Sequence, residues 1–150
     1  MISGVGYHGT NVKFSEFKCP AYFAETFETA DFFAKRAGGD NGFVIQCNIT
    51  FSNPLVVDLC GQSWGGFHLQ DSSLERNCIK YISFGNMDEE AYFEREGLTI
   101  DFLAEYAESL GYDGVVAKGC LEEGGSIETQ YVALSPSSIS IIKDMEGVAC

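Results

Sequence analysis

The stretch ISGVGYHGT, Ile2–Thr10, begins the part of the chain that decides the fold. Residues 2–7 predict a short first strand, which ends at His8-Gly9-Thr10. Gly9 predicts a tight turn there, because glycine adopts backbone conformations that strain other residues. A second short apolar run, Ala21–Ala24, follows. The N-terminal part therefore indicates short extended segments that meet at turns.

Further along, helix and strand patterns alternate. One helix is predicted to begin near Thr26 or Glu28 and to end at Gly38-Gly39, and another follows Thr99 and ends at Gly111. Residues 61–97 give no clear pattern. Apolar runs bounded by turn residues predict the remaining strands, at residues 42–51, 55–58, 114–117, 127–134 and 138–142. Many short strands with a few helices indicate an α+β protein.

The length of 150 residues fits one compact domain, residues 1–150. No stretch approaches the roughly 20 apolar residues that a membrane-spanning helix needs. The N-terminal MISGVGYHGT lacks a basic region followed by a long apolar region, so no secretory signal is expected. We therefore expect a cytoplasmic protein that does not enter membranes.

The six cysteines are scattered, at positions 19, 47, 60, 78, 120 and 150. No two form a CxxC pair, and neither histidine lies near a cysteine at the spacing of metal ligands. An even number of cysteines is also compatible with disulfides. Without a secretion signal, reduced and mostly buried thiols are the favoured interpretation, and no metal site is expected.

The chain carries 22 acidic and 9 basic side chains, a formal net charge of −13. A field of this sign repels the phosphates of nucleic acids and anionic membrane surfaces, and it attracts basic proteins. The simpler alternative is that the acidic surface only keeps a small protein soluble. If the charge serves recognition, the expected partner is a basic protein, including one that itself binds DNA or RNA.

Several short blocks follow one another in a fixed order: YHGT at 7–10, YFA at 22–24, NPLVVD at 53–58, GYDGVV at 111–116 and QYVALSP at 130–136. In this order and spacing they resemble the ADP-ribosyltransferase fold, on the side of diphtheria toxin and the poly-ADP-ribose polymerases. The likeness is greatest to the small ADP-ribosyltransferase-like domains of phage and mobile-element polyvalent proteins. The resemblance implies two packed small sheets, antiparallel or mixed, with a few flanking helices and NAD as the substrate.

The resemblance also implies which residues bind NAD. His8 would hydrogen-bond the hydroxyls of the adenosine ribose, as donor or acceptor. The backbone of Gly9 would approach the nicotinamide carboxamide closely, because no Cβ intervenes. Thr10 would add a hydroxyl contact to a ribose, and Tyr22 would wall the pocket of the nicotinamide ribose.

An aromatic side chain normally stacks on the nicotinamide ring in this family, and Phe32 or Phe33 stands at that place. The face of an aromatic ring attracts cations, so stacking on the positively charged ring is worth roughly 0.5–2 kcal/mol. The alternative is that these phenylalanines belong to the core side of an amphipathic helix, and this must hold for one of the two.

The family's third functional residue is a carboxylate, which stabilises the positive charge that develops on the ribose as nicotinamide leaves. Aligning the blocks puts Gln130 at that position, and an amide carries no negative charge. Glu128 lies two residues earlier on the same strand face, about 6.6 Å away, and is predicted as the catalytic acid. The alternative is a site without a proper acid. Glu122 and Glu123 are interpreted as a solvated acidic rim.

These residues predict a mono-ADP-ribosyltransferase that modifies a basic protein, with His8, Tyr22, Glu128 and Gln130 as the catalytic set. The resemblance to phage domains suggests a counter-defence protein in the host cytoplasm, such as an inhibitor of a CRISPR effector complex. The alternative function is a non-catalytic acidic inhibitor on the same fold that blocks a basic nucleic-acid-binding protein. Hydrolysis of NAD, or transfer to a nucleic acid, is a weaker third possibility.

Overall fold

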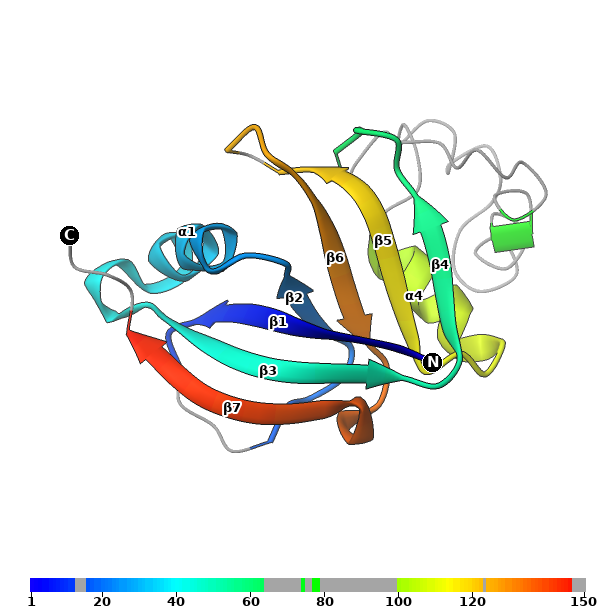
Figure 1. Ribbon diagram of the computed structural model, residues 1–150, viewed down its shortest axis with the longest axis horizontal. Helices are drawn as coiled ribbons and strands as arrows, with labels where there is room; N and C mark the ends of the chain where they lie inside the picture. The colour runs from blue at the N-terminus through cyan, green and yellow to red at the C-terminus, as the bar shows by residue number, and fades with distance from the viewer. Residues whose placement is uncertain (13–15, 64–73, 75–76, 79–99, 123, 147–150) are drawn as a thin grey trace.

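The computed structural model describes residues 1–12, 16–63, 74, 77–78, 100–122 and 124–146. Within these ranges the chain forms a seven-stranded sheet, two α-helices and two short 3-10 helices (Figure 1). This confirms the α+β class predicted from the sequence. The order of the strands across the sheet is β4-β5-β6-β2-β1-β3-β7.

The predicted strands and helices are present with small differences at their ends. The strands are β1 (Ile2–Thr10), β2 (Ala21–Ala24), β3 (Phe43–Phe51), β4 (Pro54–Asp58), β5 (Gly114–Leu121), β6 (Ile127–Ala133) and β7 (Ile139–Glu146). The helices are α1 (Phe27–Gly38), α4 (Ile100–Ser109), η1 (Gly39–Asn41) and η2 (Pro136–Ser138). The predicted cap Thr99 and most of residues 61–97 lie outside the described residues.

One continuous sheet replaces the two packed sheets that the resemblance implied. The short strand β2 pairs with β6 on one side and with β1 on the other, so it joins what would otherwise be separate sheets. The junction with β1 is a single residue pair, Tyr7 with Ala24. In Figure 1, β4, β5 and β6 run across the direction of β1, β3 and β7. The molecule therefore has two crossed half-sheets that meet at β2.

The tight turn predicted at Gly9 is wrong, because β1 continues through it to Thr10. The glycine is needed for space instead. A Cβ at Gly9 would lie 2.1 Å from the carbonyl oxygen of Ala30 and 2.8 Å from the backbone nitrogen of Ala34, both in α1. Gly9 therefore lets the helix lie directly on the strand.

Helix α1 has the signals that the sequence predicted at both ends. The side chain of Thr26 accepts a hydrogen bond from the backbone N–H of Thr29, which caps the helix N-terminus. Lys35 and Arg36 stand in the last turn, where positive charge interacts favourably with the helix dipole. The buried residues of the helix are Ala30, Asp31 and Ala34, and the helix packs against β1 and β3.

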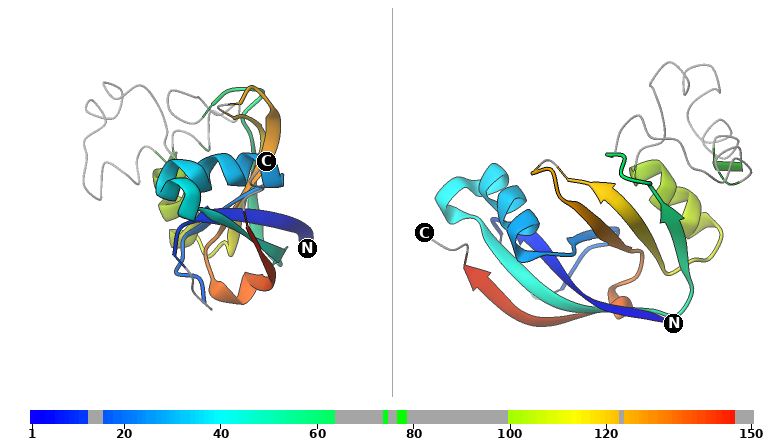
Figure 2. Two further views of the ribbon diagram at one scale, coloured as in Figure 1. Left: turned by 90° about the vertical axis from the view of Figure 1, so that its left-hand side faces the viewer. Right: turned by 45° about the horizontal axis from the view of Figure 1, so that its top comes forward.

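Helix α4 packs on the other half-sheet, as Figures 1 and 2 show. Its apolar stripe, with Leu103 and Ala107 fully buried, contacts the core residues of β4, β5 and β6. Gly111, at a φ of 83°, follows the helix end as predicted. Neither α1 nor α4 has the length and apolar character that crossing a bilayer would require.

All five cysteines among the described residues are free thiols. Three of them are buried, Cys47, Cys78 and Cys120. For this part of the chain, reduced and mostly buried cysteines agree with the interpretation favoured from the sequence.

Candidate functional site

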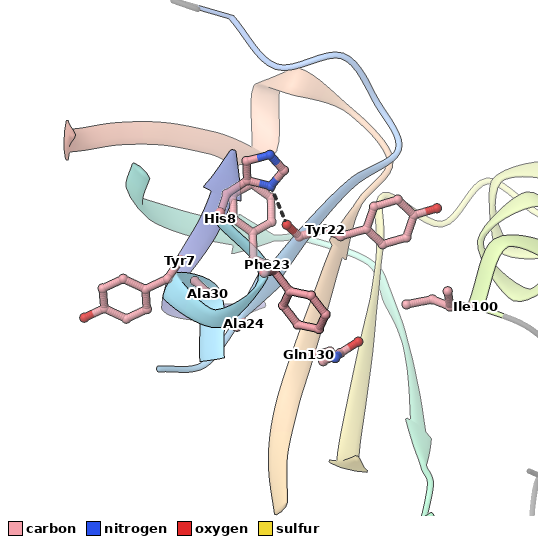
Figure 3. Close-up of a pocket in the computed structure, with 10 residues that line it drawn as sticks. Tyr7, His8, Tyr22, Phe23, Ala24, Ala30, Ile100 and Gln130 are labelled. Carbon is pink, nitrogen blue, oxygen red and sulfur yellow. Dashed lines mark hydrogen bonds between the residues drawn. The ribbon is translucent and has the colours of Figure 1, made fainter. Parts of the chain in front are cut away.

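A cavity of about 260 Å³ lies where β1, β2 and β6 meet α1 and the start of α4 (Figure 3). We call it the central pocket. It is formed at the junction of the two half-sheets. Ten residues line it: Tyr7, His8, Gly9, Tyr22, Phe23, Ala24, Ala30, Phe33, Ile100 and Gln130.

Five of the predicted site residues line this pocket, and three of them come from different strands. His8, Tyr22 and Gln130 lie far apart in the sequence, on β1, β2 and β6. These strands are neighbours in the sheet, since Ala24 of β2 pairs with Tyr7 on one side and with Gln130 on the other. The sheet order β6-β2-β1 therefore creates the convergence.

His8 is held in one orientation. Its Nδ1 lies 2.7 Å from the backbone carbonyl oxygen of Tyr22. A carbonyl only accepts hydrogen bonds, so Nδ1 carries the proton and donates. Burial lowers the pKa of His8 below its ordinary value, although the bond to Tyr22 acts in the opposite direction. The ring is therefore neutral at pH 7, with Nε2 as an acceptor, and it stacks edge-on against Phe17.

Tyr22 connects the pocket to helix α4. Its hydroxyl donates a hydrogen bond of 2.5 Å to Oδ1 of Asp101, in the first turn of that helix. Burial, followed by the carboxylate of Asp101, raises the pKa of Tyr22 above its ordinary value. Figure 3 shows the ring of Tyr22 extending toward α4, where Ile100 lies beside the pocket. This bond therefore fixes the α4 wall of the cavity.

Gln130 is hydrogen-bonded to the side chain of Glu122, a residue predicted to be solvated. Its Nε2 donates a hydrogen bond of 2.5 Å to Oε1 of Glu122. Glu122 is only 6% exposed, so its assignment to a solvated rim is wrong. The connection between β5 and β6 folds back on itself through a bond from the backbone N–H of Glu122 to the carbonyl of Ser126. From this turn the side chain of Glu122 reaches the amide of Gln130. Glu123 lies outside the described residues.

Glu128, the predicted acid, does not line the central pocket. Its carboxylate is 7% exposed and accepts hydrogen bonds from three hydroxyls: Thr26 at 2.7 Å, and Thr29 and Ser126 at 2.5 Å. Burial alone would raise the pKa of Glu128, but these hydroxyl bonds outweigh it and lower the pKa. The structure thus places an ionised carboxylate at the N-terminus of α1.

The remaining predicted residues are divided between the pocket and the surface. Gly9 and Phe33 line the central pocket. Phe32 is 46% exposed, and the guanidinium of Arg36 lies over its ring at 5.3 Å. Thr10 is not in the lining, and its hydroxyl accepts a bond from the backbone N–H of Val12 at 3.2 Å. Of the two aromatic candidates, only Phe33 is placed to stack on a ligand in the pocket.

A second cavity of about 240 Å³, which we call the outer pocket, shares Phe33 with the central one. Its wall carries two carboxylates and two hydroxyls. The residues are Glu28, Thr29, Phe32, Phe33, Glu122, Gly124 and Ser126. Glu122 thus belongs to the outer pocket, while its partner Gln130 belongs to the central pocket. Within the described ranges, no group of three or more His, Cys, Asp and Glu is arranged to hold a metal ion.

No protein-family model, no curated protein and no solved structure matches this chain. The pocket geometry and the block resemblance are therefore the basis for assigning a function.

Proposed function

We propose that the central pocket binds the nicotinamide-ribose end of NAD, and that the protein is a mono-ADP-ribosyltransferase acting on a protein. One observation carries this proposal. His8, Tyr22 and Gln130, which stand at the family's three functional positions, line a single pocket on neighbouring strands. Their convergence is not encoded in the order of the blocks along the chain, and it supports the proposal although Glu128, the acid preferred from the sequence, lies outside the pocket.

The size and chemistry of the pocket fit one end of the dinucleotide. Pockets for drug-sized ligands measure roughly 300–1,000 Å³. A cavity of about 260 Å³ is too small for all of NAD but has room for its nicotinamide end. The aromatic side chains of Phe23 and Phe33 offer apolar walls to a flat ring, and an aromatic face also attracts its positive charge.

The proposed reaction breaks the glycosidic bond between the nicotinamide nitrogen and C1′ of the ribose. The bonding electron pair leaves with nicotinamide, and a nucleophile of the target protein forms the new bond to C1′ and releases a proton. The chain's own residues bind and orient: neutral His8 offers Nε2 to a ribose hydroxyl, and Gly9 offers its backbone. Fixed polar groups of this kind need no reorganisation during the reaction.

The charge of the protein supports a basic target. At a net charge of −13, attraction to a basic protein adds to the association rate and weakens with salt. Together with the resemblance to phage domains, this makes counter-defence in a host cytoplasm the setting we propose. A nucleic-acid-binding effector, such as a CRISPR complex, has the required basic surface.

The test measures NAD binding and transfer separately. Isothermal titration with NAD is expected to show binding that His8→Ala and Gln130→Ala each weaken by about tenfold, the scale of one hydrogen bond and its packing. Thr10→Ala is the matched control, since that side chain is outside the pocket lining, and should change the affinity less than twofold. Labelled NAD in a host lysate should then mark a discrete basic protein.

One observation favours the second candidate, a non-catalytic acidic inhibitor. Glu128 is committed to three hydroxyls at the start of α1, and the third family position holds the amide of Gln130. For an inhibitor we expect no heat of NAD binding and no labelled product. A salt-sensitive stoichiometric complex with a basic effector should form instead. That combination would replace the transferase by the inhibitor.

A further inference from the structure

The carboxyl group of Glu122 is buried, and it directly contacts Gln130, which lines the central pocket. Burying a carboxylate is costly unless hydrogen bonds compensate for the lost water. Glu122 is 6% exposed, and the amide of Gln130 supplies a bond of 2.5 Å. A solvated surface glutamate would avoid this cost. The bond from Gln130 is therefore one of the contacts that compensate for this burial.

The chemistry of the two groups fixes which way the amide of Gln130 points. An amide has an oxygen that accepts and an NH₂ group that donates, whereas an ionised carboxylate only accepts. In the structure Nε2 of Gln130 donates to Oε1 of Glu122 at 2.5 Å, and with Glu122 ionised the reverse orientation would bring two accepting oxygens together. Figure 3 shows the amide oxygen of Gln130 turned to the side on which Ile100 lies. The hydrogen bond to Glu122 thereby selects one of the two orientations of the Gln130 amide, which occupy nearly the same volume.

We propose that Glu122 is a positioning residue for the NAD reaction: it holds Gln130 so that the amide oxygen faces the ligand and accepts a hydrogen bond from a ribose hydroxyl. A charged partner also polarises a hydrogen-bonded amide, which increases the negative charge on its oxygen. With Glu122 ionised, the pair then places a negative charge one hydrogen bond away from the ligand, a charge that Gln130 alone lacks. This proposal rests on the proposed function.

The placement of the two residues in different cavities supports this role. Gln130 lines the central pocket and Glu122 lines the outer pocket, so the hydrogen bond spans the wall between them. Glu28 lines the outer pocket as well, but it is exposed. Glu28 is therefore the matched carboxylate against which Glu122 can be tested.

The orientation is tested first, by NMR of the unaltered protein, which needs no ligand. The side-chain amide signals of Gln130, identified by their loss in Gln130→Ala, should show one slowly exchanging Nε2 proton. They should also show a through-bond coupling to the carboxyl carbon of Glu122. Glu28→Gln should leave these signals unchanged, and Glu122→Gln should abolish the coupling. Absence of the coupling in the unaltered protein would overturn the proposal, even if Glu122→Gln does not fold.

The positioning role is tested by kinetics and calorimetry with NAD. Glu122→Gln should lower kcat by roughly 100-fold, since charge near the reacting ribose acts mainly in the transition state. The Kd for NAD should rise by no more than about tenfold, the scale of one hydrogen bond. A purely structural role would lower the melting temperature and leave kcat per folded molecule unchanged, and that outcome would overturn the proposal.

The outcomes separate this inference from the function on which it rests. If the unaltered protein binds no NAD, the proposed function and the positioning role both fail, and the NMR coupling still decides the orientation of Gln130. If the unaltered protein binds and transfers ADP-ribose but Glu122→Gln does so equally well, only the positioning role fails. Loss of ADP-ribose transfer in Glu122→Gln but not in Glu28→Gln supports both the proposed function and the positioning role of Glu122.

Discussion

At the level of single residues, Gly9 sets the distance between β1 and α1. The hydrogen that replaces a side chain there faces the backbone of Ala30 and Ala34. The same glycine lines the central pocket beside His8. The absence of a Cβ at Gly9 therefore affects both how closely α1 lies on the sheet and the shape of the pocket wall.

Replacing Gly9 by alanine should lower the free energy of unfolding by at least about 2 kcal/mol. The added Cβ would stand 2.1 Å from a backbone oxygen, which no side-chain rotation can relieve, and overpacking of this kind costs roughly 1–3 kcal/mol or more. Urea unfolding measures the loss. Gly124→Ala is the control, because its Cβ would meet no atom within 4 Å and should cost under about 0.5 kcal/mol. Equal stabilities of the two variants would contradict the packing argument.

The order of short blocks in the sequence identified His8, Tyr22 and Gln130, and the structure places these three in one pocket. The block order gave no indication that Glu122 is buried beside this pocket. Whether a glutamate near a glycine-rich turn is solvated or buried depends on how the turn folds back, which local sequence does not encode. Glu122 and Gln130 lie eight residues apart across a predicted hairpin, which was the one signal that they could meet. This signal can be used only when the pairing register of β5 and β6 is known.

At the level of elements, the junction between β6 and α1 depends on one carboxylate. Glu128 projects from β6 and accepts hydrogen bonds from Thr26 and Thr29 at the start of α1. A negative charge at a helix N-terminus is also favoured by the helix dipole. The glutamate therefore joins a strand near the C-terminus of the chain to a helix near its beginning.

Glu128→Gln should lower the free energy of unfolding at pH 7 by about 2 kcal/mol, because an amide offers the three hydroxyls one accepting oxygen in place of two. The folded-state pKa of Glu128 lies below its ordinary value of 4.5. Its contribution is therefore complete above about pH 4.5 and is lost as the pH falls through the folded-state pKa. Urea unfolding at pH 7 and pH 3 should show the two proteins converging. A constant difference at both pH values would contradict this role.

The helices and strands were largely predictable because their ends carry local signals. Thr26 and Gly39 mark α1, and Gly111 marks the end of α4. The pairing of β2 was not predictable. A four-residue strand contains too little pattern to specify that it pairs with both β1 and β6, and this pairing decides whether there is one sheet or two.

At the level of the whole molecule, the net negative charge destabilises the folded state. The net charge of −13 is carried by a chain of only 150 residues, so the compact state suffers repulsion among like charges. This cost is compatible with a protein that binds a basic partner, whose charges would neutralise it. The sequence predicts the sign of this effect but not where on the surface the charges gather.

Raising the salt concentration from about 0.05 M to about 0.5 M should increase the free energy of unfolding by roughly 1 kcal/mol, because the screening length falls from about 14 Å to about 4 Å. Urea titrations in sodium chloride and in potassium chloride should agree, since screening does not depend on which monovalent cation is used. A decrease in stability with salt would show that attractive ion pairs, such as Lys35 with Asp31, outweigh the repulsion.

The single residue pair that joins β1 to β2 has a consequence for the order in which a growing chain acquires its pocket. During synthesis, β1 and β3 can pair as soon as Phe51 has left the ribosome, because the entropy cost of closing the loop of residues 11–42 grows only slowly with its length. Strand β2 gains its other neighbour only when Ile127–Ala133 is made. His8 and Tyr22 are thus among the first residues to be translated, and Gln130 among the last. A nascent chain that stops before β6 would lack the pocket while already containing the five strands β1 to β5.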